Sequence, residues 1–156
     1  MKLLIKQRVF SWTDAYDVYD QKEEPKYFVK AEFFTIGHVI HVYDRQEREV
    51  GCIRQRIFTL LPKFELEVGG HSMGELHREF SFFSPSYTLT GNGWEISGDF
   101  FGWEYGVNDG ARTVMSISKE LFHWGDTYVL DIADPRDELL CLLIAIGIDA
   151  ANCSHG

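Results

Sequence analysis

The chain has 156 residues, of which 45% are hydrophobic, and its 15 basic and 24 acidic side chains give a formal net charge of −9. This length suits a single domain, residues 1–156, with a sizeable core. The acidic excess excludes nucleic acid as a general partner and disfavours anionic membranes over most of the surface. Three cysteines make no disulfide framework, and Met1–Lys6 is too short an apolar run for a signal peptide, so we expect a cytoplasmic location.

Short strands separated by tight turns are predicted over most of the chain. The clearest example is the alternation of Phe64, Leu66 and Val68 with charged residues, which is typical of a half-buried strand. Asp109-Gly110 is a strong hairpin signal. In chain order, strands are predicted at residues 2–7, 15–20, 26–34, 39–44, 49–58, 63–68, 73–80, 87–89, 94–98, 104–108, 112–119 and 127–132.

The last predicted element is a helix at about residues 135–152. Asp134 suits the N-cap and Pro135 the first helical position, and the ten residues Leu139–Ile148 carry no charge. A helix that is apolar on every face must be buried on all sides. Ten residues span only about 15 Å, against roughly 30 Å for a bilayer core, so we expect a core helix and no transmembrane segment. Gly147 predicts a close approach to a neighbouring element.

Together these elements predict a mainly β fold, an approximately twelve-stranded closed β-barrel wrapped around a hydrophobic C-terminal α-helix. A sandwich leaves no channel for a helix, whereas large barrels do. A lipocalin-like barrel is the rival, but its helix packs outside and is amphipathic. Five aromatic residues are expected in the barrel wall and core: Trp94, Phe100, Phe101, Trp103 and Tyr105.

The order of these elements resembles the tubby C-terminal-like superfamily, most closely its LURP-one-related and phospholipid-scramblase-like branch. The resemblance covers essentially the whole chain and implies a twelve-stranded barrel around a central helix. It rests on the order and spacing of four segments: Lys6-Gln7-Arg8-Val9-Phe10-Ser11, Gly37-His38-Val39-Ile40-His41-Val42-Tyr43-Asp44, Trp94-Glu95-Ile96-Ser97-Gly98-Asp99, and Asp126-Thr127-Tyr128-Val129 with the helix that follows.

The resemblance carries limited information on activity. Tubby-type members bind phosphoinositides through basic residues, and scramblase members depend on calcium and are lipidated. This chain departs from the scramblase pattern, because Thr127–Ala133 offers only Asp131 where an acidic calcium loop is expected, and no cysteine cluster for palmitoylation is visible. We therefore do not expect this chain to act as a scramblase.

Two constellations could carry catalysis. His71, Glu75 and His77 offer nitrogen and oxygen ligands for a small metal-dependent hydrolase, but their spacing matches no known ligand motif. His38 and His41 with Cys52 could pair a base with a thiol nucleophile, yet a third orienting residue is missing. We therefore expect no catalytic site, no metal and no cofactor.

A basic patch is the remaining candidate site. Arg54 and Arg56 share one face of a strand, Lys63 begins the next strand, and Arg78 lies on the one after. Adjacent strands lie about 4.8 Å apart, so these side chains could converge and hold a phospholipid head group. The alternative is a solvated wall whose arginines pair with Glu65, Glu67 and Glu79. The sequence thus favours a non-enzymatic barrel that binds a phospholipid head group or a partner protein.

Overall fold

The structure is a computed structural model that describes residues 1–6, 15–32, 37–80 and 84–153. Within these residues the chain forms twelve strands and a terminal helix. The strands are β1 (Lys2–Lys6), β2 (Ala15–Asp20), β3 (Pro25–Ala31), β4 (Val39–Tyr43), β5 (Glu49–Gln55), β6 (Lys63–Val68), β7 (His71–Glu79), β8 (Ser86–Leu89), β9 (Trp94–Asp99), β10 (Glu104–Asp109), β11 (Arg112–Phe122) and β12 (Gly125–Ile132).

The strands form one closed antiparallel barrel in sequence order. Closure comes from β1, which pairs with β12 from Lys2↔Asp131 to Lys6↔Thr127 and with β2 on its other edge. A closed barrel has no exposed strand edge. The predicted fold class is therefore confirmed, including the number of strands.

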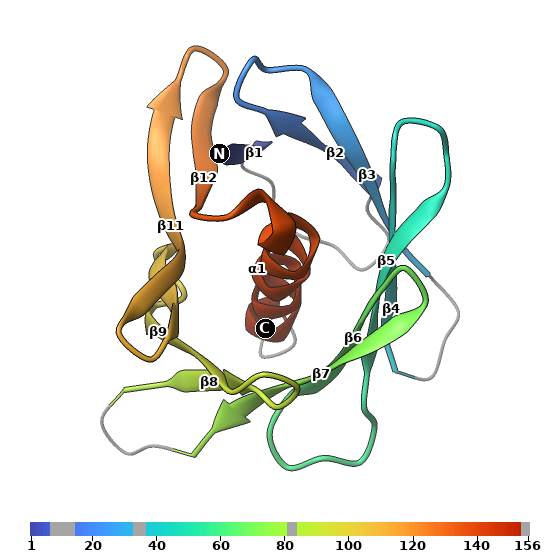
Figure 1. Ribbon diagram of the computed structural model, residues 1–156, viewed down its shortest axis with the longest axis vertical. Coiled ribbons are helices and arrows are strands. Elements are labelled where there is room, and N and C mark those ends of the chain that lie inside the picture. The colour runs from blue at the N-terminus through green and yellow to red at the C-terminus, as the bar shows by residue number, and fades with distance from the viewer. Residues whose placement is uncertain (7–14, 33–36, 81–83, 154–156) are drawn as a thin grey trace.

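The helix runs through the middle of the barrel (Figure 1). A 3₁₀ turn, η1 (Pro135–Asp137), precedes the α-helix α1 (Glu138–Cys153). Asp134 caps this turn, because its side chain accepts a hydrogen bond of 3.0 Å from the Arg136 N–H. The predicted helix is thus confirmed, with its first turn wound as 3₁₀.

Apolar side chains from the inner faces of the strands pack around the helix. From Leu140 to Ile148 no side chain is more than 7% exposed, and Ile53, Phe64 and Leu66 of the wall are fully buried. A Cβ on Gly147 would lie only 3.2 Å from Leu76, so this glycine does mark a close approach of helix and wall, as predicted. The helix is therefore the centre of the hydrophobic core.

Three sequence predictions differ from the structure or fall outside it. Phe101 is 69% exposed, whereas the other four aromatic residues of its cluster are buried as expected. The predicted strand 49–58 ends at Gln55, so Ile57 and Phe58 belong to a loop. Residues 7–11 of the first resemblance segment and residues 33 and 34 of the third predicted strand lie outside the described residues.

The two ends of the barrel carry different connections. Because consecutive strands are antiparallel, the β5–β6, β7–β8, β9–β10 and β11–β12 connections all lie at one end, which we call the exit rim. The helix begins at the opposite end, after β12, and finishes at the exit rim. There Asn152 Nδ2 donates a 3.0 Å hydrogen bond to the Phe100 carbonyl in the β9–β10 connection.

Candidate functional site

Arg54, Arg56 and Lys63 lie together on the outer wall, at the exit-rim end of β5 and β6. Their strand neighbours Ile53 and Phe64 are buried against the helix, so alternation turns these basic side chains outward. The Arg56 N–H donates to the Lys63 carbonyl over 2.9 Å, which places the two residues side by side at the start of the loop.

The two arginines are held by glutamates on the neighbouring strands. Arg54 Nε lies 3.5 Å from Glu67 Oε1, and Arg56 Nε lies 2.7 Å from Glu75 Oε2. Arg56 also forms an ion pair with Glu65. The hydrogen bond from Arg56 is the main reason that the pKa of Glu75 is lowered. Of the three glutamates that the sequence offered as alternative partners, Glu65 and Glu67 pair with these arginines, and Glu75 rather than Glu79 is the third partner.

Arg78 lies on a different face from the other three basic residues. In β7 it is two residues from Leu76, which is fully buried, and it is the register partner of the buried Tyr87 on β8. Alternation therefore places it on the inner face of the wall. The structure brings together Arg54, Arg56 and Lys63, and separates Arg78 from them.

The loop between β5 and β6 carries the most exposed apolar side chains among the described residues. Phe58 is 98% exposed, Leu60 is 96% exposed and Ile57 is 45% exposed. A hollow of about 330 Å³ lies under this loop and is lined in part by His38, Gln55 and Arg56. Sequence reasoning missed this feature because it placed residues 57 and 58 in a strand.

Exposed apolar residues recur at the other connections of the exit rim. Of the eight large hydrophobic residues that are exposed in the described part of the chain, six lie at this end. Besides the three in the β5–β6 loop, they are Phe80 after β7, Phe101 between β9 and β10, and Leu121 near the end of β11.

His71, Glu75 and His77 do not converge. Glu75 and His77 are neighbours on the outer face, with Nε2 of His77 3.2 Å from Glu75 Oε1, but the other Glu75 oxygen is taken by Arg56. His71 lies at the far end of β7, opposite Val68. Within the described residues this trio is not a group that could share one metal ion.

A different trio, His41, Glu49 and Cys52, does come together on β4 and β5. His41 and Cys52 are register partners, and Cys52 Sγ lies 4.0 Å from His41 Nδ1. The same ring nitrogen lies 2.5 Å from Glu49 Oε1, while Nε2 lies 3.1 Å from Glu32 Oε1. Cys52 is only 3% exposed although it points outward, because its neighbours cover it.

The electrostatics of this cluster oppose thiol nucleophilicity. Burial raises the pKa of Cys52 to about 11, so the thiol is protonated at neutral pH. Burial lowers the pKa of His41, but hydrogen bonds to Glu49 and Glu32 outweigh that effect and leave this pKa raised. His38 lies apart from this cluster and lines the hollow at the exit rim. Burial lowers the pKa of His38.

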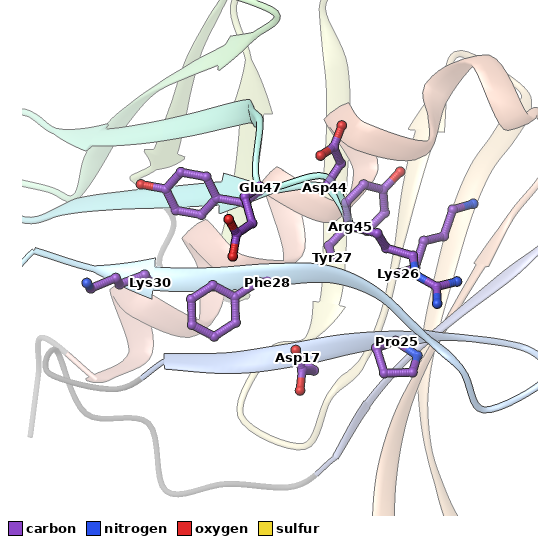
Figure 2. Close-up of a pocket in the computed structure, with 10 residues that line it drawn as sticks. Asp17, Pro25, Lys26, Tyr27, Phe28, Lys30, Asp44, Arg45 and Glu47 are labelled. Carbon is purple, nitrogen blue, oxygen red and sulfur yellow. The ribbon is translucent and has the colours of Figure 1, made fainter.

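An open groove of about 550 Å³ lies on the outer face of β2, β3 and the β4–β5 turn (Figure 2). Phe28 and Tyr43 supply apolar surface. Three basic and three acidic side chains are interspersed along it, so the groove has no net charge: Lys26, Lys30, Arg45, Asp17, Asp44 and Glu47. Lys26 is already committed to Glu138, with a distance of 2.8 Å between Nζ and Oε1.

A membrane-spanning role for α1 has no support in its dimensions. Among the described residues, no helix has the length and apolar character needed to cross a bilayer.

The fold is a closed barrel around a buried C-terminal helix, which is the architecture that the resemblance to the tubby-like superfamily implies, and the LURP-one-related family lies in that superfamily. The sequence model of the LURP-one-related family matches residues 1–149, so the chain belongs to that family. It is also 36% identical over 149 residues to YxjI, an uncharacterised protein of Bacillus subtilis (strain 168). This alignment covers 96% of the chain and 92% of the relative. No solved structure matches the chain significantly.

Proposed function

We propose that this LURP-one-related barrel is a non-catalytic protein that docks on phospholipid membranes through its exit rim. In this proposal Phe58 and Leu60 enter the interfacial layer, and Arg54, Arg56 and Lys63 contact the head groups. The observation that carries it is the position of two almost fully exposed apolar side chains in the loop that joins these basic residues.

The cost of exposing such side chains supports this proposal. Burying one Phe or Leu side chain is worth roughly 1.5–3 kcal/mol, so leaving both in water calls for a surface that covers them. The six exposed apolar residues come from four connections around one rim. Because these side chains are spread around one end of the barrel, a flat partner such as a bilayer could cover all of them at once. A peptide bound in a single groove would cover only some of them.

The basic residues provide the head-group contact. Lys63 has no ion-pair partner among the described residues, and the arginines can exchange an exposed glutamate for a phosphate oxygen. Each basic residue near an anionic membrane contributes about 1 kcal/mol. The groove in Figure 2 is a weaker candidate, because its acidic side chains balance its basic ones.

The absence of catalysis is part of the proposal. His71 is remote from Glu75 and His77, and the pKa of the Cys52 thiol is about 11, which argues against both catalytic constellations considered from the sequence. A cytoplasmic location stays a prediction, and the buried free thiols Cys52 and Cys141 are compatible with it.

Vesicle co-sedimentation tests the proposal. We expect the full chain to sediment with vesicles that contain phosphatidylserine, more weakly with pure phosphatidylcholine, and most strongly at low salt. The Phe58→Ser/Leu60→Ser variant should bind at least about 100-fold more weakly. Met73→Ser, which removes a half-exposed side chain near the opposite end, is the matched control and should bind like wild type.

Arg54→Gln/Arg56→Gln tests the head-group contact. Gln is preferable to Glu, which would add negative charges beside Glu65, Glu67 and Glu75. This variant should lose the preference for phosphatidylserine while keeping weak binding to phosphatidylcholine. A wild-type protein that ignores both vesicles at low salt would refute membrane docking. If the wild-type chain ignores both kinds of vesicle but binds another protein, and the Phe58→Ser/Leu60→Ser variant does not, then the exit rim is a protein-binding surface instead.

A further inference from the structure

We propose that His41, Glu49 and Cys52 form a binding site for a divalent cation of the zinc class, independent of the rim. The ligand atoms, one ring nitrogen, one carboxylate oxygen and one sulfur, all lie within 4.8 Å of one another. Imidazole, thiolate and carboxylate are the donors that zinc takes in proteins.

The distances between the ligand atoms lie on either side of those in a tetrahedral site. With the usual zinc bond lengths, tetrahedral ligand atoms are separated by roughly 3.3–3.7 Å. The distance from His41 Nδ1 to Cys52 Sγ is 4.0 Å, and that to Glu49 Oε1 is 2.5 Å. Glu49 has a side chain that is 46% exposed, so it can rotate by the small amount that a metal ion requires. Three protein ligands leave a fourth position for water.

The far side of the histidine ring provides an independent argument. In metal sites the second ring nitrogen of a ligand histidine usually donates to a carboxylate, which fixes the tautomer and the ring orientation. Here Nε2 lies 3.1 Å from Glu32 Oε1, so Nδ1 can face the metal as the unprotonated nitrogen. Tyr43 stacks on the same ring, with centroids 6.2 Å apart, and further restricts it.

An ion pair alone explains only part of this cluster. It accounts for a histidine between Glu32 and Glu49, but it does not use the thiol next to the same ring nitrogen. The pair His77 and Glu75 shows the difference, because it has a similar His–Glu contact on the outer wall and belongs to no potential metal group among the described residues. Cys52 is therefore the residue that distinguishes a metal site from a salt bridge.

This proposal departs from the expectation, drawn from the sequence, that the protein binds no metal. That expectation rested on the spacing of His71, Glu75 and His77, which the fold indeed keeps apart. Pairing of β4 with β5 instead brings together residues that are 8 and 11 positions from each other in the sequence. A metal ion there would link β4 and β5, and its ligand His41 would also hold Glu32, the residue that follows β3.

Cobalt and zinc titrations of the untagged full chain test the site. We expect one equivalent of Co²⁺ to produce a thiolate-to-metal charge-transfer band, which Zn²⁺ removes by displacement. Cys52→Ser and His41→Gln should each lose the band and weaken zinc binding at least about 100-fold, and Glu32→Ala should weaken it about 10–100-fold. His77→Gln is the matched control, and Cys153→Ser/His155→Gln tests the chain end; both should bind like wild type.

X-ray absorption of the zinc-loaded Cys153→Ser protein gives a readout that does not depend on a ligand variant. One sulfur and otherwise nitrogen or oxygen neighbours are expected around zinc. A shell without sulfur, a missing cobalt band, or unchanged affinity in Cys52→Ser would each overturn the metal site. Vesicle co-sedimentation of the same preparations, with and without zinc, would show whether the exit rim binds membranes independently of the metal site.

Discussion

The inner and outer faces of β5 and β6 are held by different forces. Inside, Ile53, Phe64 and Leu66 pack against α1 and are fully buried. Outside, Arg54 and its neighbours lie in a network of half-exposed ion pairs. Burial of apolar surface contributes far more free energy than exposed ion pairs do. The inner face therefore determines whether the barrel folds, while the outer face can change its chemistry at little cost to stability.

Removal of the helix should have the largest effect of any change. A chain that ends after Asp134 leaves an apolar lumen open to water, so we expect it to unfold or aggregate. Ile144→Asp places a carboxylate among fully buried side chains, which costs several kcal/mol even if the group takes up a proton. Circular dichroism and size-exclusion chromatography would detect the loss of the cooperative fold.

The control for this prediction is Ile144→Val, which should lower the free energy of unfolding by only about 0.5–1.5 kcal/mol. A truncated chain that stays soluble, strand-rich and unchanged in melting temperature would show that the helix is an appendage. The contrast between the two faces would then have no basis.

Ile53→Ala tests the inner face of the wall itself. This side chain is fully buried against the core, so its truncation should lower the free energy of unfolding by about 2–5 kcal/mol. Urea titration followed by tryptophan fluorescence measures the change. A loss below 0.5 kcal/mol, within the range of ordinary surface substitutions, would contradict tight packing of the wall on the helix.

The difference between the two faces also explains how far the sequence could predict the molecule. Strand alternation and the uncharged run from Leu139 specify the inner face, because burial leaves a periodic pattern in the chain. Arg78 could have been excluded from the basic patch in the same way, since it shares the face of Leu76. The trio of His41, Glu49 and Cys52 could not be predicted from alternation alone. A register shift between Val42 and Tyr43 determines where Glu49 lies.

Asp149 is an acidic residue near the end of the apolar helix, and it makes the stability of the protein depend on pH. Burial raises its pKa to about 7, whereas in the unfolded chain it is about 3.9. Between these values the native carboxyl keeps a proton that the unfolded chain has lost. The free energy of unfolding should therefore fall as pH rises from about 4 to 7, and then level off.

Asp149→Asn should remove most of that fall. We expect the variant to match wild type near pH 4 and to be more stable at pH 8, by on the order of 4 kcal/mol. Urea titrations at several pH values would measure the difference. Parallel pH profiles of the two proteins would mean that the Asp149 carboxyl is as well solvated in the folded state as in the unfolded chain.

Arg54→Gln should have the smallest effect, although Arg54 is the direct neighbour of Ile53. Its side chain is 47% exposed and its nitrogen lies 3.5 Å from the Glu67 oxygen, a geometry in which ion pairs contribute at most about 1 kcal/mol. We expect a loss within that limit at low salt and a smaller one at 1 M salt, where charges on the surface are screened over about 3 Å. Urea titrations of Arg54→Gln and Ile53→Ala at both salt concentrations compare adjacent positions on opposite faces of one strand. A salt-independent loss as large as that of Ile53→Ala would mean that the Arg54 side chain stabilises the barrel by packing, and that the outer face is not free to vary.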